Sequence, residues 1–231
     1  MQTVVAPQVV VVAREGAGRS LAAASPRRTY DIGPSLREVL FQLRSTTVSG
    51  DIAIECVAVG EDPPELRLEA EDIAALADAR ANLMIALQPN ESHGRTAAES
   101  GDSVRVLLAV TGTHITPAEV VEILELAATE QHDSQTRIAR GRRKDLPAIW
   151  ACEIGAASPG SLNPMIVRAL SDLMPRAARL AQFAAEREAR VTVELVSKLL
   201  DARQRLVLEW PTLELLRRFH AGLWYDPLIE T

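Results

Sequence analysis

The pattern of apolar and polar residues between positions 190 and 227 predicts an alternating strand, a turn, a second strand, an amphipathic helix and a short aromatic ending. The same order of patterns occurs between residues 51 and 89. When Ile52 is set against Val191, with one extra residue in the later turn, identical pairs include Glu55 with Glu194. We therefore predict that the chain is internally duplicated.

The earlier part of the chain, residues about 8–89, is interpreted as a degenerate copy. A β-branched run at 9–13 predicts a buried strand, and Pro34 fits the first position of a helix with one apolar stripe. Residues 14–28 show no such pattern and predict a loop. The elements expected in this part are strands at 9–13, 29–33, 52–57, 66–68 and 83–87 and helices at 34–44 and 72–80.

The later part follows a segment without apolar periodicity, residues 90–102, which predicts a linker. In this part Thr116 can cap a helix, Pro117 fits its first position, and Glu119 can complete a capping box. The elements expected before residue 190 are a strand at 104–110, the helix after Thr116, a polar loop at 129–147, a strand at 149–154 and a helix at 161–189 broken near Pro175.

These patterns predict an α+β fold of two tandem related halves. Each half is expected to hold a mostly antiparallel sheet with helices packed on one face, an arrangement of ferredoxin-like character. The predicted boundaries are 1–89 for the degenerate half, 90–102 for the linker and 103–231 for the second half.

The composition excludes several classes of protein. The 231 residues carry a net charge of −6, which disfavours nonspecific binding to nucleic acid and suits a basic protein partner. No apolar run has the roughly 18 residues of a membrane span, so we expect a cytoplasmic protein that does not bind a membrane. Cys56 and Cys152 have no CxxC partner, and the four histidines have no metal-ligand spacing, so we predict no metal, no cofactor and no catalytic residue.

The later half resembles the bacterial domain-of-unknown-function 4279 family over residues about 104–228. The residues that carry the resemblance are Gly112, Pro117 and Glu119 in the strand-turn-helix segment, Arg140-Gly141, Trp150, and the closing Leu223-Trp224-Tyr225-Asp226. The resemblance implies a small α+β domain found in bacteria, with no established activity and no catalytic residue to transfer. The earlier half departs from the pattern because it lacks both the Gly-x-x-x-x-Pro turn and a tryptophan.

Three groups of residues are candidates for binding. Glu55 and Glu194 occupy equivalent places in the two copies and would form a carboxylate pair if the copies pack about a twofold axis; solvent-facing strand positions are the alternative. The segment from Arg137 to Lys144, with Arg140, Arg142 and Arg143, is a basic loop that would meet phosphates or simply be solvated. Trp210, before Pro211, is expected at a turn, where an exposed ring would mark a binding surface.

The sequence thus favours a noncatalytic bacterial protein-binding module, of an immunity or regulatory type, more readily than an enzyme. One alternative is a small-ligand binder or an enzyme that uses a cleft between the two copies around Glu55 and Glu194. The other is nucleic-acid binding through the loop from Arg137 to Lys144. The sequence defines neither the partner nor the oligomeric state.

Overall fold

Two sheets of six strands organise the chain. The computed structural model describes residues 8–15, 19–28, 32–43, 52–59, 66–88, 103–139, 142–199 and 205–229. The first sheet has the strand order β13-β6-β4-β1-β2, with β3 also paired to β1, and the second has the order β5-β14-β12-β7-β11-β8. Both sheets are mixed, because β4 pairs with β6 and β12 with β14 in parallel, whereas the other pairs are antiparallel.

The bounds of the elements follow. The first sheet contains β1 (Gln8–Glu15), β2 (Arg19–Ala23), β3 (Arg27–Arg28), β4 (Ile52–Val59), β6 (Ala81–Gln88) and β13 (Arg205–Leu208). The second contains β5 (Leu66–Leu68), β7 (Val104–Gly112), β8 (Glu130–His132), β11 (Ala148–Ala157), β12 (Arg190–Leu199) and β14 (Ala221–Ile229). The helices are α1 (Gly33–Leu43), α2 (Ala70–Asp78), α3 (Pro117–Leu124), α4 (Leu162–Glu186) and α5 (Trp210–Arg218), and β9 (Gln135–Ala139) and β10 (Arg142–Leu146) form a separate ribbon.

Alternating residues of the strands supply the core. Val9, Val11 and Ala13 of β1 are fully buried, whereas the residues between them are half-buried, as expected for a sheet with helices on one face. The buried apolar side chains from both sheets form one large cluster that includes Trp150 and Phe219. The fold is therefore α+β, as predicted.

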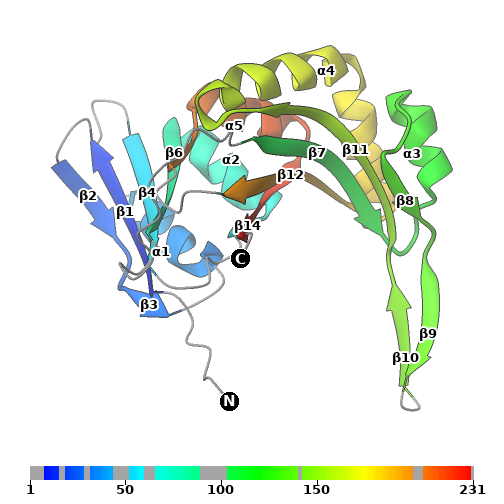
Figure 1. Cartoon of the computed structure of the whole chain (residues 1–231), viewed down its shortest axis with the longest axis horizontal. Helices are drawn as coiled ribbons and strands as arrows, with labels where there is room; N and C mark the ends of the chain where they lie inside the picture. The colour runs from blue at the N-terminus through cyan, green and yellow to red at the C-terminus, as the bar shows by residue number, and fades with distance from the viewer. Residues whose placement is uncertain are drawn as a thin grey trace.

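Each sheet takes an edge strand from the other side of residue 103. β5 pairs with β14, where Leu68 lies opposite Leu223, and β13 pairs with β6, where Leu208 lies opposite Leu83. These pairings do not confirm two tandem halves, because strands cross between the sheets (Figure 1). The domain boundaries and the origin by duplication stay predictions.

The two similar runs nevertheless have the same order and pairing of elements. Ile52 lies opposite Ala81 in the parallel pair of the first sheet, and Val191 lies opposite Ala221 in that of the second. Ile52 and Val191 are aligned in the comparison of the two runs, and the same alignment sets Ala81 against Ala221.

Two predicted loops were wrong. Residues 14–28 contain the end of β1 and all of β2 and β3, and the β1–β2 hairpin is not recognisable from periodicity because β2 (RSLAA) has few apolar residues. Its edge is closed by the Gln42 side chain, whose amide bonds the backbone N–H and C=O of Ala23, both at 3.3 Å. Likewise, residues 129–147 contain β8, β9 and β10 in place of a loop.

Pro175 does not end the long helix. α4 runs through it, because Pro175 is exposed and the buried positions Leu173 and Ala177 on either side keep one face against the core. In Figure 1 the helix changes direction between its first, yellow-green part and its second, gold part. The predicted linker at 90–102 and most of the predicted strand at 29–33 lie outside the described residues.

Candidate functional site

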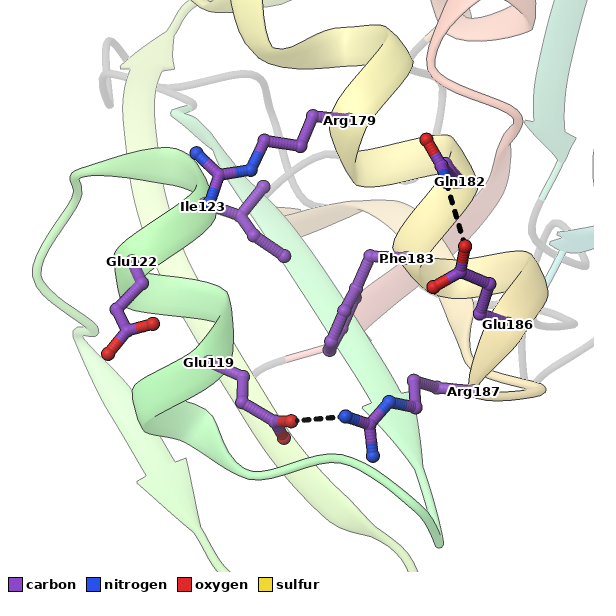
Figure 2. A pocket seen from close by; sticks show the side chains of 8 residues that line it. All are labelled: Glu119, Glu122, Ile123, Arg179, Gln182, Phe183, Glu186 and Arg187. Carbon is purple, nitrogen blue, oxygen red and sulfur yellow. Dashed lines mark hydrogen bonds and ion pairs between the residues drawn. The ribbon is translucent and has the colours of Figure 1, made fainter.

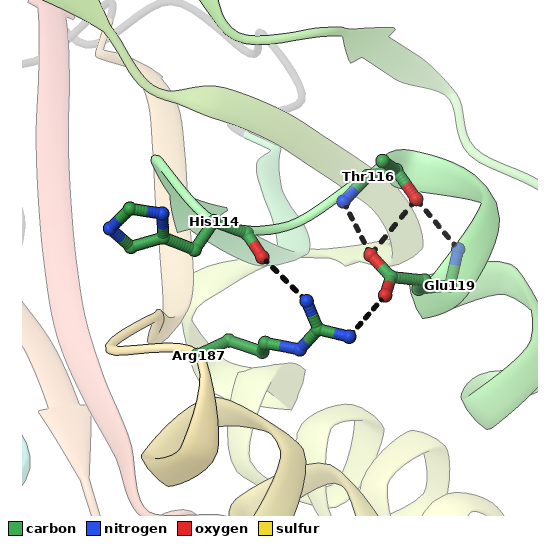
Figure 3. A network of polar contacts seen from close by, with 4 residues as sticks. All are labelled: His114, Thr116, Glu119 and Arg187. Carbon is green, nitrogen blue, oxygen red and sulfur yellow. Dashed lines mark hydrogen bonds and ion pairs between the residues drawn. The ribbon is translucent and has the colours of Figure 1, made fainter.

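Helix α3 begins with the capping box that the sequence predicts. The Glu119 carboxylate accepts a hydrogen bond from the backbone N–H of Thr116 at 2.8 Å, and the Glu119 backbone N–H donates to the Thr116 hydroxyl at 3.4 Å. The hydroxyl also donates to the carboxylate at 3.0 Å (Figure 3). These bonds satisfy backbone donors of the first helical turn and fix the position of the carboxylate.

Arg187, the C-cap residue of α4, binds the same carboxylate. Its Nη2 donates to Oε1 of Glu119 at 2.7 Å, and its Nη1 donates to the backbone carbonyl of His114 at 3.3 Å (Figure 3). The hydrogen bonds from the Thr116 backbone and hydroxyl, and then the Arg187 charge, outweigh partial desolvation and lower the pKa of Glu119 below its usual value. Glu119 is therefore an ionised anchor between α3 and α4.

A second ion pair ties the opposite end of α3 to the same helix. Glu125 ends α3 in the left-handed conformation, with a φ of 55°, and its carboxylate pairs with Arg176 of α4. The start of α3 therefore lies beside the end of α4, and the end of α3 lies beside Arg176, in the middle of α4. The two helices are antiparallel, and both ends of α3 are tied to α4.

Between these ion pairs lies an open groove of ≈ 340 Å³, which we call the α3–α4 groove. Figure 2 shows Phe183 and Ile123 projecting into the space between the helices, with Arg179 beside Ile123. Arg179 and Glu122 form no hydrogen bond or ion pair with another described residue. The groove is lined by Glu119, Glu122, Ile123, Arg179, Gln182, Phe183, Glu186 and Arg187.

The residues that line the groove are charged, amide or apolar side chains. No thiol, hydroxyl or imidazole lines it, so it lacks a nucleophile and base pair. Glu119 is already engaged with Thr116 and Arg187. An apolar centre with a charged rim is the usual composition of a protein-binding surface.

The α4 residues of the groove were not predicted, because the pattern of residues 161–189 indicates only a long helix. A signal was available: Arg179, Phe183 and Arg187 are spaced by four, which places them on one helical face. Only the folded structure shows that this face of α4 lies against α3.

The two candidate glutamates lie on different sheets. Glu55 of β4 has Val12 and Met84 as cross-strand neighbours, and its carboxylate accepts a hydrogen bond from Arg14 at 3.2 Å. Glu194 of β12 has Leu107 and Trp224 as its neighbours. Neither glutamate lines the α3–α4 groove, and their pairing stays a prediction.

Trp210 is half-buried as the first residue of α5, and not at a turn. Its indole Nε1 donates to the carbonyl of Ala77 at 2.9 Å, its backbone N–H donates to Oδ1 of Asn82 at 2.8 Å, and Arg80 lies 5.7 Å from the ring centroid. These contacts join α5 to α2 and β6. Trp210 therefore has a structural role, because it packs between elements that are distant in the chain.

The basic candidates lie on or beside the ribbon of β9 and β10. Arg142 and Arg143 begin β10, where they pair with Ala139 and Ile138 of β9. Arg140 lies outside the described residues. The segment expected as a loop is therefore mostly a β-hairpin.

Other reactive groups are inert or isolated. Burial raises the pKa of the Cys56 thiol to about 12, so the thiol stays protonated. Among the described residues, no group of three or more His, Cys, Asp or Glu side chains is placed to hold a metal ion. In the same part of the chain, no helix combines the length and apolar character needed to cross a bilayer.

Comparison with known proteins gives one match. The family model for the domain of unknown function DUF4279 matches residues 102–230, which is more than half of the chain. Searches of curated proteins and of solved structures found no match. The matched segment includes α3, α4 and the groove between them, so the candidate site lies within the shared domain. As the resemblance of its later half suggested, the chain belongs to the DUF4279 family.

Proposed function

We propose that this chain is a noncatalytic protein-binding module that docks its partner on the α3–α4 groove. The observation that carries the proposal is the placement of the half-buried Phe183, packed beside the buried Ile123, between two interhelical ion pairs. A site that is already ordered loses little entropy on binding, and an aromatic side chain at its centre is a common anchor. The partner's apolar side chain would pack on Phe183.

The charge of the groove favours a basic partner. Once the Glu119–Arg187 pair is set aside, Glu122 and Glu186 outnumber Arg179 on the rim. The chain as a whole carries −6, which attracts a basic protein over a longer range. We infer a regulatory or immunity-type role in the bacterial cytoplasm.

The test is capture of a stoichiometric partner by the tagged full chain in its host, followed by affinity measurement with variants. Phe183→Ala removes the apolar anchor and should weaken binding at least tenfold. Glu122→Lys should weaken it similarly, because it adds a positive charge that repels a basic partner. Glu71→Lys makes the same charge change on α2, where Glu71 is exposed, and should leave affinity within about twofold.

Arg179→Glu decides the sign of the partner's charge. With a basic partner it should strengthen binding, whereas with an acidic partner it should weaken binding. The proposal is wrong if no stoichiometric partner is found, or if Phe183→Ala and Glu122→Lys bind as well as Glu71→Lys. Circular dichroism of each variant checks that the fold is retained.

A further inference from the structure

β9 and β10 form an arm that stands apart from the rest of the structure. They pair with each other and, among the described strands, with no third strand. Figure 1 shows this ribbon extending away from the second sheet, beyond β8 and β11. An isolated two-stranded ribbon is marginally stable in water. The pairing of β9 with β10 alone therefore stabilises the arm only weakly.

The arm is basic, whereas the rest of the chain is acidic. β9 carries Arg137, and β10 carries Arg142, Arg143, Lys144 and Asp145, which gives four positive residues, one negative residue and a net charge of +3. Because the whole chain carries −6, everything outside the two strands carries −9. The positive charge is therefore concentrated on one projecting element.

The register sets like charges against each other. Lys144 is directly opposite Arg137 in the antiparallel ladder. Like charges at such positions destabilise a strand pair. A bound anion would offset this unfavourable pairing. By its register, Arg142 shares a face of the ribbon with Arg137 and Lys144, whereas Arg143 is on the other face.

We propose that the β9–β10 arm binds duplex DNA by entering the major groove. The major groove, about 12 Å wide, admits a two-stranded β-ribbon, and its flanking phosphates bind Arg and Lys. The deep, narrow major groove of duplex RNA does not admit a ribbon. The acidic body repels phosphates, so the contact is confined to the arm and is weak and sensitive to salt.

The experiment titrates the full chain into a fluorescently labelled DNA duplex of about 20 base pairs and follows anisotropy at several salt concentrations. Four phosphate contacts predict a slope of log K against log salt of about −3.6, which corresponds to a loss of about 100-fold between 50 and 200 mM salt. The double variants Arg137→Gln/Lys144→Gln and Arg142→Gln/Arg143→Gln should each reduce the steepness of the slope by about 2. Arg19→Gln/Arg168→Gln removes two exposed arginines from β2 and α4 and should leave the curve unchanged.

Each alternative has its own outcome. No binding at about 20 mM salt, or equal binding by the arm variants, overturns the proposal. Binding of duplex RNA as tightly as DNA overturns the assignment to the major groove. If light scattering shows self-association that the arm variants abolish, and DNA does not bind, the arm's partner is the acidic body of a second copy and the proposal is wrong.

The arm proposal does not depend on the proposed function of the groove. Glu122→Lys should leave the salt slope for DNA unchanged, because Glu122 lies on α3 and not on the arm. Loss of protein binding and loss of DNA binding are thus separable by these variants.

Discussion

Oε1 of Glu119 lies 2.7 Å from Nη2 of Arg187 at the junction of α3 and α4. The hydrogen bonds from Thr116 to this carboxylate, and then the charge of Arg187, lower the pKa of Glu119 and make the junction sensitive to pH. The pKa of Glu119 in the folded chain lies below the value of about 4.3 expected in the unfolded chain. Ionised Glu119 therefore stabilises the folded state above that value, and the stabilisation is lost as the pH falls through the folded pKa. We predict that Glu119→Gln loses less stability than the parent chain between about pH 5 and pH 3.

Urea denaturation of both proteins at the two pH values measures this difference. Glu122→Gln is the control, because Glu122 lies on the same helix but has no ion pair with a described residue. It should lose as much stability as the parent. Equal losses by the parent and Glu119→Gln would show that the carboxylate contributes nothing to the junction.

The close approach of β5 to β14 depends on Gly222. A Cβ atom at this position would lie 2.5 Å from the backbone carbonyl oxygen of Leu68, and backbone cannot move aside as a flexible side chain can. We predict that Gly222→Ala lowers the free energy of unfolding by about 2 kcal/mol, in the range for overpacking. Gly160→Ala, with nothing within 4 Å of the added atom, should change it by less than about 0.5 kcal/mol. Chemical denaturation of the two variants gives the comparison, and equal effects would contradict the exchanged position of β5.

An ion pair between the exposed Arg37 and the buried Asp72 holds α1 against α2. Both Asp72 carboxylate oxygens accept hydrogen bonds from Arg37, at 2.7 and 2.9 Å, and the Asp72 side chain is 5% exposed. Asp72 also accepts a hydrogen bond from the Glu69 backbone N–H at 3.1 Å, which caps α2. Since Arg37 is half-exposed, we predict that Asp72→Ala, which removes both contacts, costs about 2 kcal/mol, less than the loss of one partner of a fully buried pair. Asp78→Ala on the same helix removes the exposed pair with Arg217 and should cost about 0.5 kcal/mol or less. Thermal and urea unfolding of the two variants measure these losses of stability. Similar losses would contradict the prediction.

The sequence was sufficient for most single elements. β-branched runs predicted β1, and Thr116, Pro117 and Glu119 located the start of α3, because these signals depend only on neighbouring residues. Periodicity did not identify β2, β9 or β10, since these short strands are rich in polar residues and show no regular apolar alternation in the sequence. The edge of β2 depends on Gln42, which follows it in α1 and reaches back to Ala23.

Contacts between segments that are distant in the chain could not be predicted from local sequence patterns. Asn163 is buried and binds three groups: it donates to the Val207 carbonyl at 2.8 Å and accepts from the Glu209 backbone and the Thr212 hydroxyl. Nothing near Asn163 in the sequence indicates these partners. The α3–α4 groove was missed for the same reason, because the identity of the helix facing Phe183 is a property of the fold.

The exchange of β5 and β13 predicts that the later segment does not fold independently. A fragment of residues 103–231 would lack β5, which leaves the edge of β14 at Leu223 without its partner, and it would lack β6, which pairs with β13. Unpaired strand edges associate with other chains, so the fragment should be less stable than the whole chain and should form dimers or larger species. Size-exclusion chromatography with light scattering measures this association.

Co-expression with residues 1–102 is the control for that fragment. The two pieces together supply both exchanged strands, so they should recover a one-to-one complex with the circular dichroism spectrum of the intact chain. If residues 103–231 alone remained monomeric and melted within a few degrees of the intact chain, pairing with β5 and β6 would contribute little, and the predicted boundary at residue 103 would mark an independent domain. Because Leu66, Leu68, Leu206 and Leu208 of the exchanged strands are all buried in the intact chain, we expect that the fragment depends on the earlier segment.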